Sequence, residues 1–127
     1  MNDKLFVKQF NSALKLREEK KYDEAIQVFL DLIKIKPSDT ATFGMLAATY
    51  WDLGNLTKAI EYFQYAITLN EKSETASLGL YHTLWSSGRH EDALEEMKRF
   101  CSLQYSEEYN LILKELNESW DEDERDQ

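Results

Sequence analysis

Hydrophobic positions recur along the chain with the spacing of amphipathic helices. Residues 40–53 carry four apolar side chains at i, i+3, i+4 and i+7, which places them on one helical face. These side chains are Phe43, Leu46, Ala47 and Tyr50. Gly54 follows, and a second apolar stripe runs through residues 56–69. Because glycine ends a helix at little steric cost, the pattern predicts two helices joined by a short turn.

This helix pair is written three times at a period of 34 residues. A small alanine marks each copy, and a bulky residue follows it four places later. The alanines are Ala25, Ala59 and Ala93, and the bulky residues are Phe29, Phe63 and Met97. Gly54 and Gly88 follow the same period, but Lys20 stands at the corresponding place in the first copy. Self-similarity at such a period indicates a stack of helical hairpins, in which each alanine lets two helices approach closely.

The repeated positions resemble those of the tetratricopeptide repeat family. On that register the repeats are residues 6–39, 40–73 and 74–107. The second copy matches best, whereas Tyr81 and Phe100 of the third are bulkier than the family pattern. The resemblance implies an all-α fold, a right-handed solenoid of antiparallel helix pairs with about seven helices.

The segment after the third copy is predicted to close the stack. A terminal repeat cannot bury its outer face alone, so residues 107–118 are assigned as a capping helix. Its apolar stripe holds Tyr109, Ile112, Leu113 and Leu116. Residues 1–118 would then form a single domain. Residues 119–127 carry too much like charge to pack and are predicted to be an acidic, disordered tail.

Charge and composition narrow the range of partners. The net charge is −9, and residues 118–127 alone carry six acidic and one basic side chain. Such a field opposes binding to nucleic acid and to anionic membrane surfaces, and it suits a basic partner. Cys101 is the only cysteine, so no internal disulfide can form. With no apolar run of about 20 residues and no signal peptide, the chain is expected to be cytoplasmic.

Candidate catalytic residues are few. His82, His90 and Cys101 are the obvious ones, without a supporting constellation. His90 begins a predicted helix, and Cys101 beside Phe100 is expected to be a small buried hydrophobe. No metal-ligand spacing or glycine-rich phosphate loop is present. We therefore expect neither an enzyme nor a bound cofactor or metal.

The resemblance also implies a concave groove lined by the first helix of each repeat. The positions carried over are Phe10, Leu14, Arg17, Ala48, Trp51, Asp52, Leu78, His82 and Trp85. Arg17, Trp51 and Trp85 share one register and should form a ladder of side chains that often dominate binding energy. An alternative interpretation places both tryptophans in the core between repeats.

The leading functional hypothesis is a non-catalytic protein-interaction module that holds a peptide or amphipathic helix in this groove. The alternative is a dedicated chaperone or immunity-type protein that sequesters one basic client. A further alternative is self-assembly of the open ends into a homodimer. Some members of the family grip acidic chaperone tails with Lys and Asn side chains, but the corresponding positions here include Phe10, Leu14 and Thr75. We therefore predict that such tails do not bind.

Overall fold

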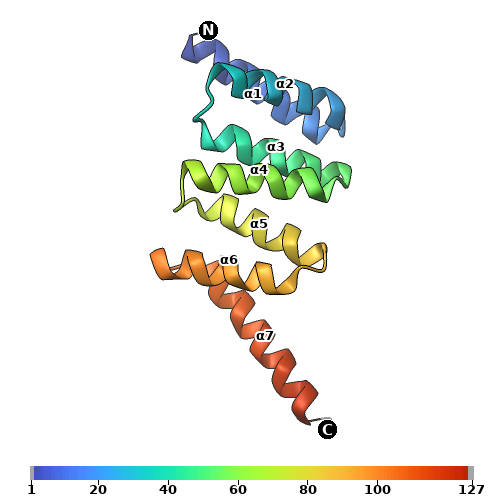
Figure 1. Ribbon diagram of the computed structural model, residues 1–127. Helices are drawn as coiled ribbons and strands as arrows, with labels where there is room; N and C mark the ends of the chain where they lie inside the picture. Colours follow the sequence, from blue (N-terminus) through green and yellow to red (C-terminus); the bar gives the residue numbers. More distant parts are fainter. Residues whose placement is uncertain (1, 126–127) are drawn as a thin grey trace.

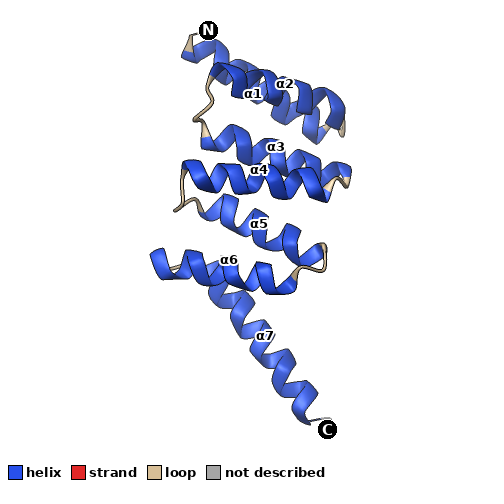
Figure 2. Ribbon diagram, viewed as in Figure 1, coloured by secondary structure: helices blue, strands red, loops and turns tan. Residues whose placement is uncertain are grey.

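Helices make up almost all of the described part of the chain, residues 2–125 of the computed structural model, and no strand occurs there (Figures 1 and 2). Side chains are described as far as residue 119. The helices are α1 (Asp3–Glu18), α2 (Tyr22–Ile35), α3 (Thr40–Leu53), α4 (Leu56–Leu69), α5 (Glu74–Ser86), α6 (His90–Leu103) and α7 (Glu107–Arg125). The all-α fold predicted from the sequence is confirmed.

The first six helices form three antiparallel pairs stacked in chain order (Figure 1). Each of these six helices contacts its neighbours in sequence, and α3 also contacts α1 and α5. The odd-numbered helices therefore share one side of the stack. The two ends of the chain lie at opposite ends of the molecule, and α7 leaves the stack at an angle (Figure 1).

Polar side chains begin several of these helices. The free backbone N–H groups of a first turn need acceptors, and a short side chain at the N-cap supplies one. The acceptors are Asn2, Asp39, Asn55, Ser73 and Ser106, which cap α1, α3, α4, α5 and α7. The starts of these five helices are therefore specified by local sequence.

The turn inside each pair uses one left-handed residue. These residues are Lys20, Gly54 and Gly88, with φ of 63°, 87° and 80°. Each turn also has a backbone hydrogen bond that spans five residues, as from Asn55 N–H to the Tyr50 carbonyl at 2.9 Å. Glycine adopts this conformation freely, whereas Lys20 has a Cβ that opposes it. The first turn therefore keeps the family geometry with a less suitable residue.

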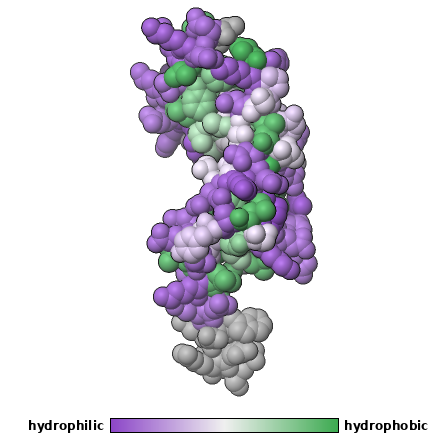
Figure 3. All heavy atoms as spheres, turned by 90° about the vertical axis from the view of Figure 1, so that its left-hand side faces the viewer, coloured by the Kyte–Doolittle hydropathy of each residue, from purple (hydrophilic) through white to green (hydrophobic). Residues whose placement is uncertain are grey.

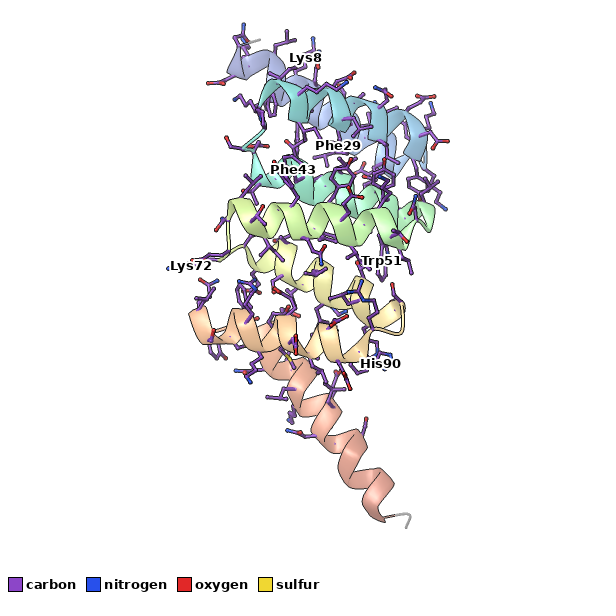
Figure 4. All side chains as sticks on the ribbon, viewed as in Figure 1. Lys8, Phe29, Phe43, Trp51, Lys72 and His90 are labelled. Atoms are coloured by element: carbon purple, nitrogen blue, oxygen red, sulfur yellow. The ribbon has the colours of Figure 1, made fainter. Side chains whose placement is uncertain are left out.

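The residues that defined the period form the core. Ala25, Ala59 and Ala93 are fully buried, and the bulky residues that follow them are also buried. Phe29 and Phe43 lie between the helices in Figure 4. Burial of such side chains contributes about 1.5–3 kcal/mol each relative to exposure. The spacing read from the sequence thus identifies the interior of the stack.

The bulky residues of the third repeat form a socket for α7. Tyr109, 1% exposed, meets the ring of Tyr81 edge-on at 5.6 Å and the ring of Phe100 at 5.7 Å. Ile112 and Leu116 also pack on this cluster, whereas Leu113, predicted to share their stripe, is 47% exposed. The departures from the family pattern therefore hold the last helix.

The last helix also extends further than the sequence indicated. The capping helix was expected to end at residue 118, with a disordered tail from 119, yet α7 continues to Arg125. No glycine or proline lies between residues 107 and 127, so no strong helix breaker stops it. Residues 126 and 127 of the predicted tail lie outside the described residues.

Candidate functional site: the face of the odd-numbered helices

The nine predicted groove residues all lie on α1, α3 and α5. None is fully buried: Asp52 and His82 are exposed and the other seven are partly buried. Side chains left in contact with solvent on one face of a solenoid are available to a partner. The prediction that they bind a partner nevertheless stays a prediction.

A pocket of about 470 Å³ opens between the amino-terminal halves of α3 and α5, with Phe10 of α1 at its edge. Its apolar lining is Phe10, Ala41, Gly44, Met45 and Ala76, and its polar lining is Thr40, Asn70, Ser73 and Thr75. The pocket lies within the size range of small-molecule and side-chain sites. It opens on the side of the stack that carries the α2–α3 and α4–α5 loops, where hydrophobic patches alternate with hydrophilic surface (Figure 3).

Two glycines lie inside helices on this face, and packing accounts for only one of them. A Cβ placed on Gly79 of α5 would stand 2.3 Å from the ring of Phe63, so packing requires a glycine there. A Cβ placed on Gly44 of α3 would meet no heavy atom within 4 Å. A glycine inside a helix costs roughly 0.5–1 kcal/mol relative to alanine. The neighbouring helices give no packing reason for Gly44, and its missing side chain deepens the pocket.

Arg17 and Asp52 form an ion pair across α1 and α3. The Arg17 Nε donates to an Asp52 carboxylate oxygen at 2.5 Å, and its Nη1 lies 3.9 Å from the Met45 sulfur. The side chains are 31% and 25% exposed. Both were predicted groove residues, but the sequence did not indicate that they pair. The one sequence feature that could have suggested the pair is the spacing of 35 residues. This is one period plus one, and it places the two residues on adjacent helices of one face.

The two tryptophans have different surroundings. Trp51 packs on the largest core cluster and remains partly exposed. Trp85 stacks on His90 at 4.2 Å and on Tyr81 at 5.9 Å. It also lines a second pocket of about 290 Å³ between α5 and α7, together with His82 and Ile112. In the predicted ladder of Arg17, Trp51 and Trp85, the last residue, Trp85, therefore lies next to α7.

A buried polar network was missed by the sequence reading. The Ser77 hydroxyl donates to Glu96 at 2.6 Å, and Arg99 donates twice to the same carboxylate at 2.8 Å and 2.7 Å. Because the serine proton is used, the Tyr109 hydroxyl donates to Ser77 Oγ at 2.7 Å. Burial raises the pKa of Tyr109 well above its usual range. The sequence signal for this network is weak, because charged residues at i, i+3 such as Glu96 and Arg99 are also typical of a solvated helix face.

The candidate catalytic residues are not supported by a constellation of neighbouring groups among the described residues. Cys101 is exposed, so the expectation of a small buried hydrophobe is wrong; Phe100 takes the inward position on α6 instead. No group of three His, Cys, Asp or Glu side chains in the described part of the chain could hold a metal ion. Among the same residues, no helix has both the length and the apolar character needed to cross a membrane.

The class defined by these features is a stack of two-helix repeats with an open face. The tetratricopeptide repeat model matches residues 8–39 and 41–73, so the chain belongs to the tetratricopeptide repeat family. This is a non-catalytic family of protein-interaction repeats. The resemblance predicted from the sequence is confirmed.

Similar proteins extend this result. A small glutamine-rich tetratricopeptide repeat-containing protein 2 from Mycosarcoma maydis is 29% identical over 94 residues, which are 74% of this chain. The matched part is 27% of that protein, so the chain spans about a quarter of the length of this relative.

Solved structures show the same fold at low sequence identity. The first repeat domain of Spaghetti (RPAP3), bound to the HSP90 peptide SRMEEVD, has a TM-score of 0.80 at 18% identity, covering 94% of this chain and 98% of that one. The Yersinia enterocolitica type III secretion chaperone SycD, in complex with a peptide of the translocator YopD, has a TM-score of 0.79 at 19% identity and covers 93% and 90%. These likenesses show the fold alone.

Proposed function

We propose that the chain is an interaction module that holds an extended peptide or an amphipathic helix of a partner on the face of α1, α3 and α5. The pocket around Gly44 carries this proposal. Helix α3 loses stability by having a glycine at residue 44, although the surrounding helices leave space for a side chain there. Close approach of a ligand to the backbone is a recognised reason for such a glycine. Both similar structures cited above hold peptides.

The chemistry of the pocket suits one apolar anchor with polar groups beside it. Phe10, Met45 and Ala76 form an apolar wall, while Asn70 and Thr75 offer polar atoms at the rim. An apolar side chain would gain from leaving water in the pocket, and the rim could bond the peptide backbone. Further along the face, Arg17 and Trp51 are partly exposed and are the residue types that most often anchor interfaces.

Filling the pocket tests the proposal. Random displayed peptides would be selected on the wild-type protein, and the affinities of the winners compared with those for Gly44→Leu by fluorescence titration. A Cβ at residue 44 meets no heavy atom within 4 Å, so the leucine side chain is expected to fill the pocket, and leucine favours the helix. The fold should therefore persist by circular dichroism. We expect affinity to fall by at least about tenfold, or about 1.4 kcal/mol.

The matched control is Thr57→Leu, which adds the same side chain at an exposed position of α4. It should leave the affinity unchanged. Trp51→Ala should also weaken binding while the helical signal persists. If Gly44→Leu binds the selected peptides as tightly as the wild type, the pocket is not the site.

Acidic chaperone tails are proposed not to be the ligand. The peptide SRMEEVD is bound by the RPAP3 domain, but this chain has Phe10, Leu14 and Thr75 where basic or amide side chains would grip a carboxylate. Titration with SRMEEVD should give no saturable signal. Micromolar binding would contradict the proposal.

A second candidate function is the sequestration of one basic client, as a dedicated chaperone. The net charge of −9 favours it, because an acidic surface steers basic partners and rejects acidic ones. The complex with such a client should weaken steeply as salt rises, since screening shortens the reach of the charges. A complex that is indifferent to salt would favour the apolar pocket instead.

A further inference from the structure

One face of the first helix holds exposed apolar and basic side chains. This amino-terminal face consists of Lys4, Leu5, Val7, Lys8 and Lys15 on α1. Leu5 and Val7 are 43% and 53% exposed. Lys8 lies at the α1 end of the stack and points outward (Figure 4). None of the three lysines forms an ion pair with another described residue. The face therefore combines apolar surface with free positive charge.

Comparison with α3 and α5 shows what this face lacks. One period after Lys8, Ser12 and Lys15 stand Thr42, Leu46 and Thr49, which are fully buried against the preceding pair. One period further, Ala76, Leu80 and Thr83 are also buried. In α1 the three corresponding positions, Lys8, Ser12 and Lys15, are exposed, and two of them are lysines. In the later repeats these positions pack on the preceding helix pair.

The other end of the stack presents the opposite charge. On α7, Leu111 is 51% exposed and is surrounded at helical spacing by carboxylates. The carboxylates of this carboxyl-terminal face are Glu107, Glu108, Glu115 and Glu118, all exposed. Lys114 is the one base among its described residues, so four acidic and one basic side chain give the face −3. The three lysines of the amino-terminal face give +3.

We propose that copies of this chain associate head to tail, with the amino-terminal face of one copy on the carboxyl-terminal face of the next. Each face has exposed apolar surface among charged side chains, and the net charges of the two faces are opposite, +3 and −3. Complementary rims of this kind set register and speed association. Because the two faces are different surfaces, each added copy leaves a free face at both ends, so the assembly can continue past a dimer. This contact is separate from the pocket around Gly44.

Sedimentation velocity over a range of concentrations tests the proposal. The wild-type protein should show species that grow with concentration in about 0.1 M salt and disappear in about 1 M salt, where the Debye length falls from about 10 Å to about 3 Å. A chain that stays monomeric at every concentration would overturn the proposal.

Charge reversal of each face then identifies the contact. Lys4→Glu, Lys8→Glu and Lys15→Glu together should abolish assembly, and so should Glu108→Lys, Glu115→Lys and Glu118→Lys together. An equal mixture of the two variants should assemble again, because each retains the face that the other needs. A matched control reverses the exposed lysines Lys34, Lys58 and Lys72, which changes the net charge equally and should assemble like the wild type.

Two results would contradict head-to-tail contact even if the protein self-associates. Assembly lost only in the lysine variant would indicate a symmetric contact between two α1 helices. Failure of the mixture, with both variants folded by circular dichroism, would show that the two faces do not meet.

Discussion

The second and third repeats use opposite chemistry at corresponding positions. In the second, the ring of Phe43 lies 6.3 Å from that of Tyr62 and 4.5 Å from that of Tyr65. One period later, the same three positions hold Ser77, Glu96 and Arg99, joined by hydrogen bonds. The same helical hairpin is therefore held by aromatic packing in one case and by a polar network in the other.

The difference corresponds to the element that follows each repeat in the stack. Aromatic packing tolerates changes in geometry, whereas a buried carboxylate needs every partner in place. The network of the third repeat reaches Tyr109 of α7 through Ser77. The second repeat is followed by an ordinary repeat, but the third must fix one last helix at a defined angle. Directional bonds are suited to that task.

Removal of Tyr109 should have the largest effect on stability. Tyr109→Ala deletes a buried ring from between Tyr81 and Phe100 and should lower the free energy of unfolding by about 3–5 kcal/mol. Urea denaturation followed by circular dichroism measures it. Tyr105→Ala, at a 75% exposed tyrosine, is the control and should change stability by less than about 0.5 kcal/mol.

Changes at the paired positions 62 and 96 sharpen the comparison. Glu96→Leu leaves Arg99 and Ser77 without their buried acceptor and should cost about 2–3 kcal/mol. Tyr62→Leu keeps an apolar side chain against Phe43 and should cost less than about 1.5 kcal/mol. The same denaturation experiment reports both. Equal losses would mean that the two repeats do not differ in the way described.

The glycines of the two repeats should respond with opposite sign. Gly79→Ala forces a Cβ against Phe63 and should destabilise the fold by about 1–3 kcal/mol. Gly44→Ala has open space and should stabilise it by about 0.5–1 kcal/mol. Thermal melts of the two variants decide the point. A loss of stability in Gly44→Ala would show that the fold itself needs that glycine.

Alkaline pH gives a smaller effect that also separates the repeats. Unfolded tyrosines ionise near pH 10, whereas burial raises the pKa of Tyr109 and keeps its proton in the folded state. The folded protein then binds more protons, so stability falls above pH 10 by up to about 1.4 kcal/mol per pH unit for this group. Tyr109→Phe should reduce that slope in stability measured from pH 9 to 11. An unchanged slope would assign the loss to other tyrosines, such as Tyr50 and Tyr81, whose pKa values burial also raises.

Periodicity predicted the stack because small and bulky positions are imposed by helix contact. Ala59 could be recognised as buried from its spacing alone, and the structure confirms it. The polar network could not, because Glu96 and Arg99 have the same composition as a solvated surface pair. Glu96 is buried and bonds Ser77, which in turn bonds Tyr109 on a different helix. For the same reason the pairing of Arg17 with Asp52 required knowledge of how α1 sits on α3.

The left-handed turn at Lys20 has a consequence for how the molecule opens. A Cβ in this conformation costs about 1 kcal/mol that glycine would not, and the strain lies in the terminal repeat. Because repeats contact only their neighbours, α1 can detach and relieve it by giving up its contacts with α2 and α3, while the packing among α4, α5 and α6 stays in place. The amide hydrogens of α1 should therefore exchange with solvent before those of the central helices, so that the stack frays from its amino-terminal end.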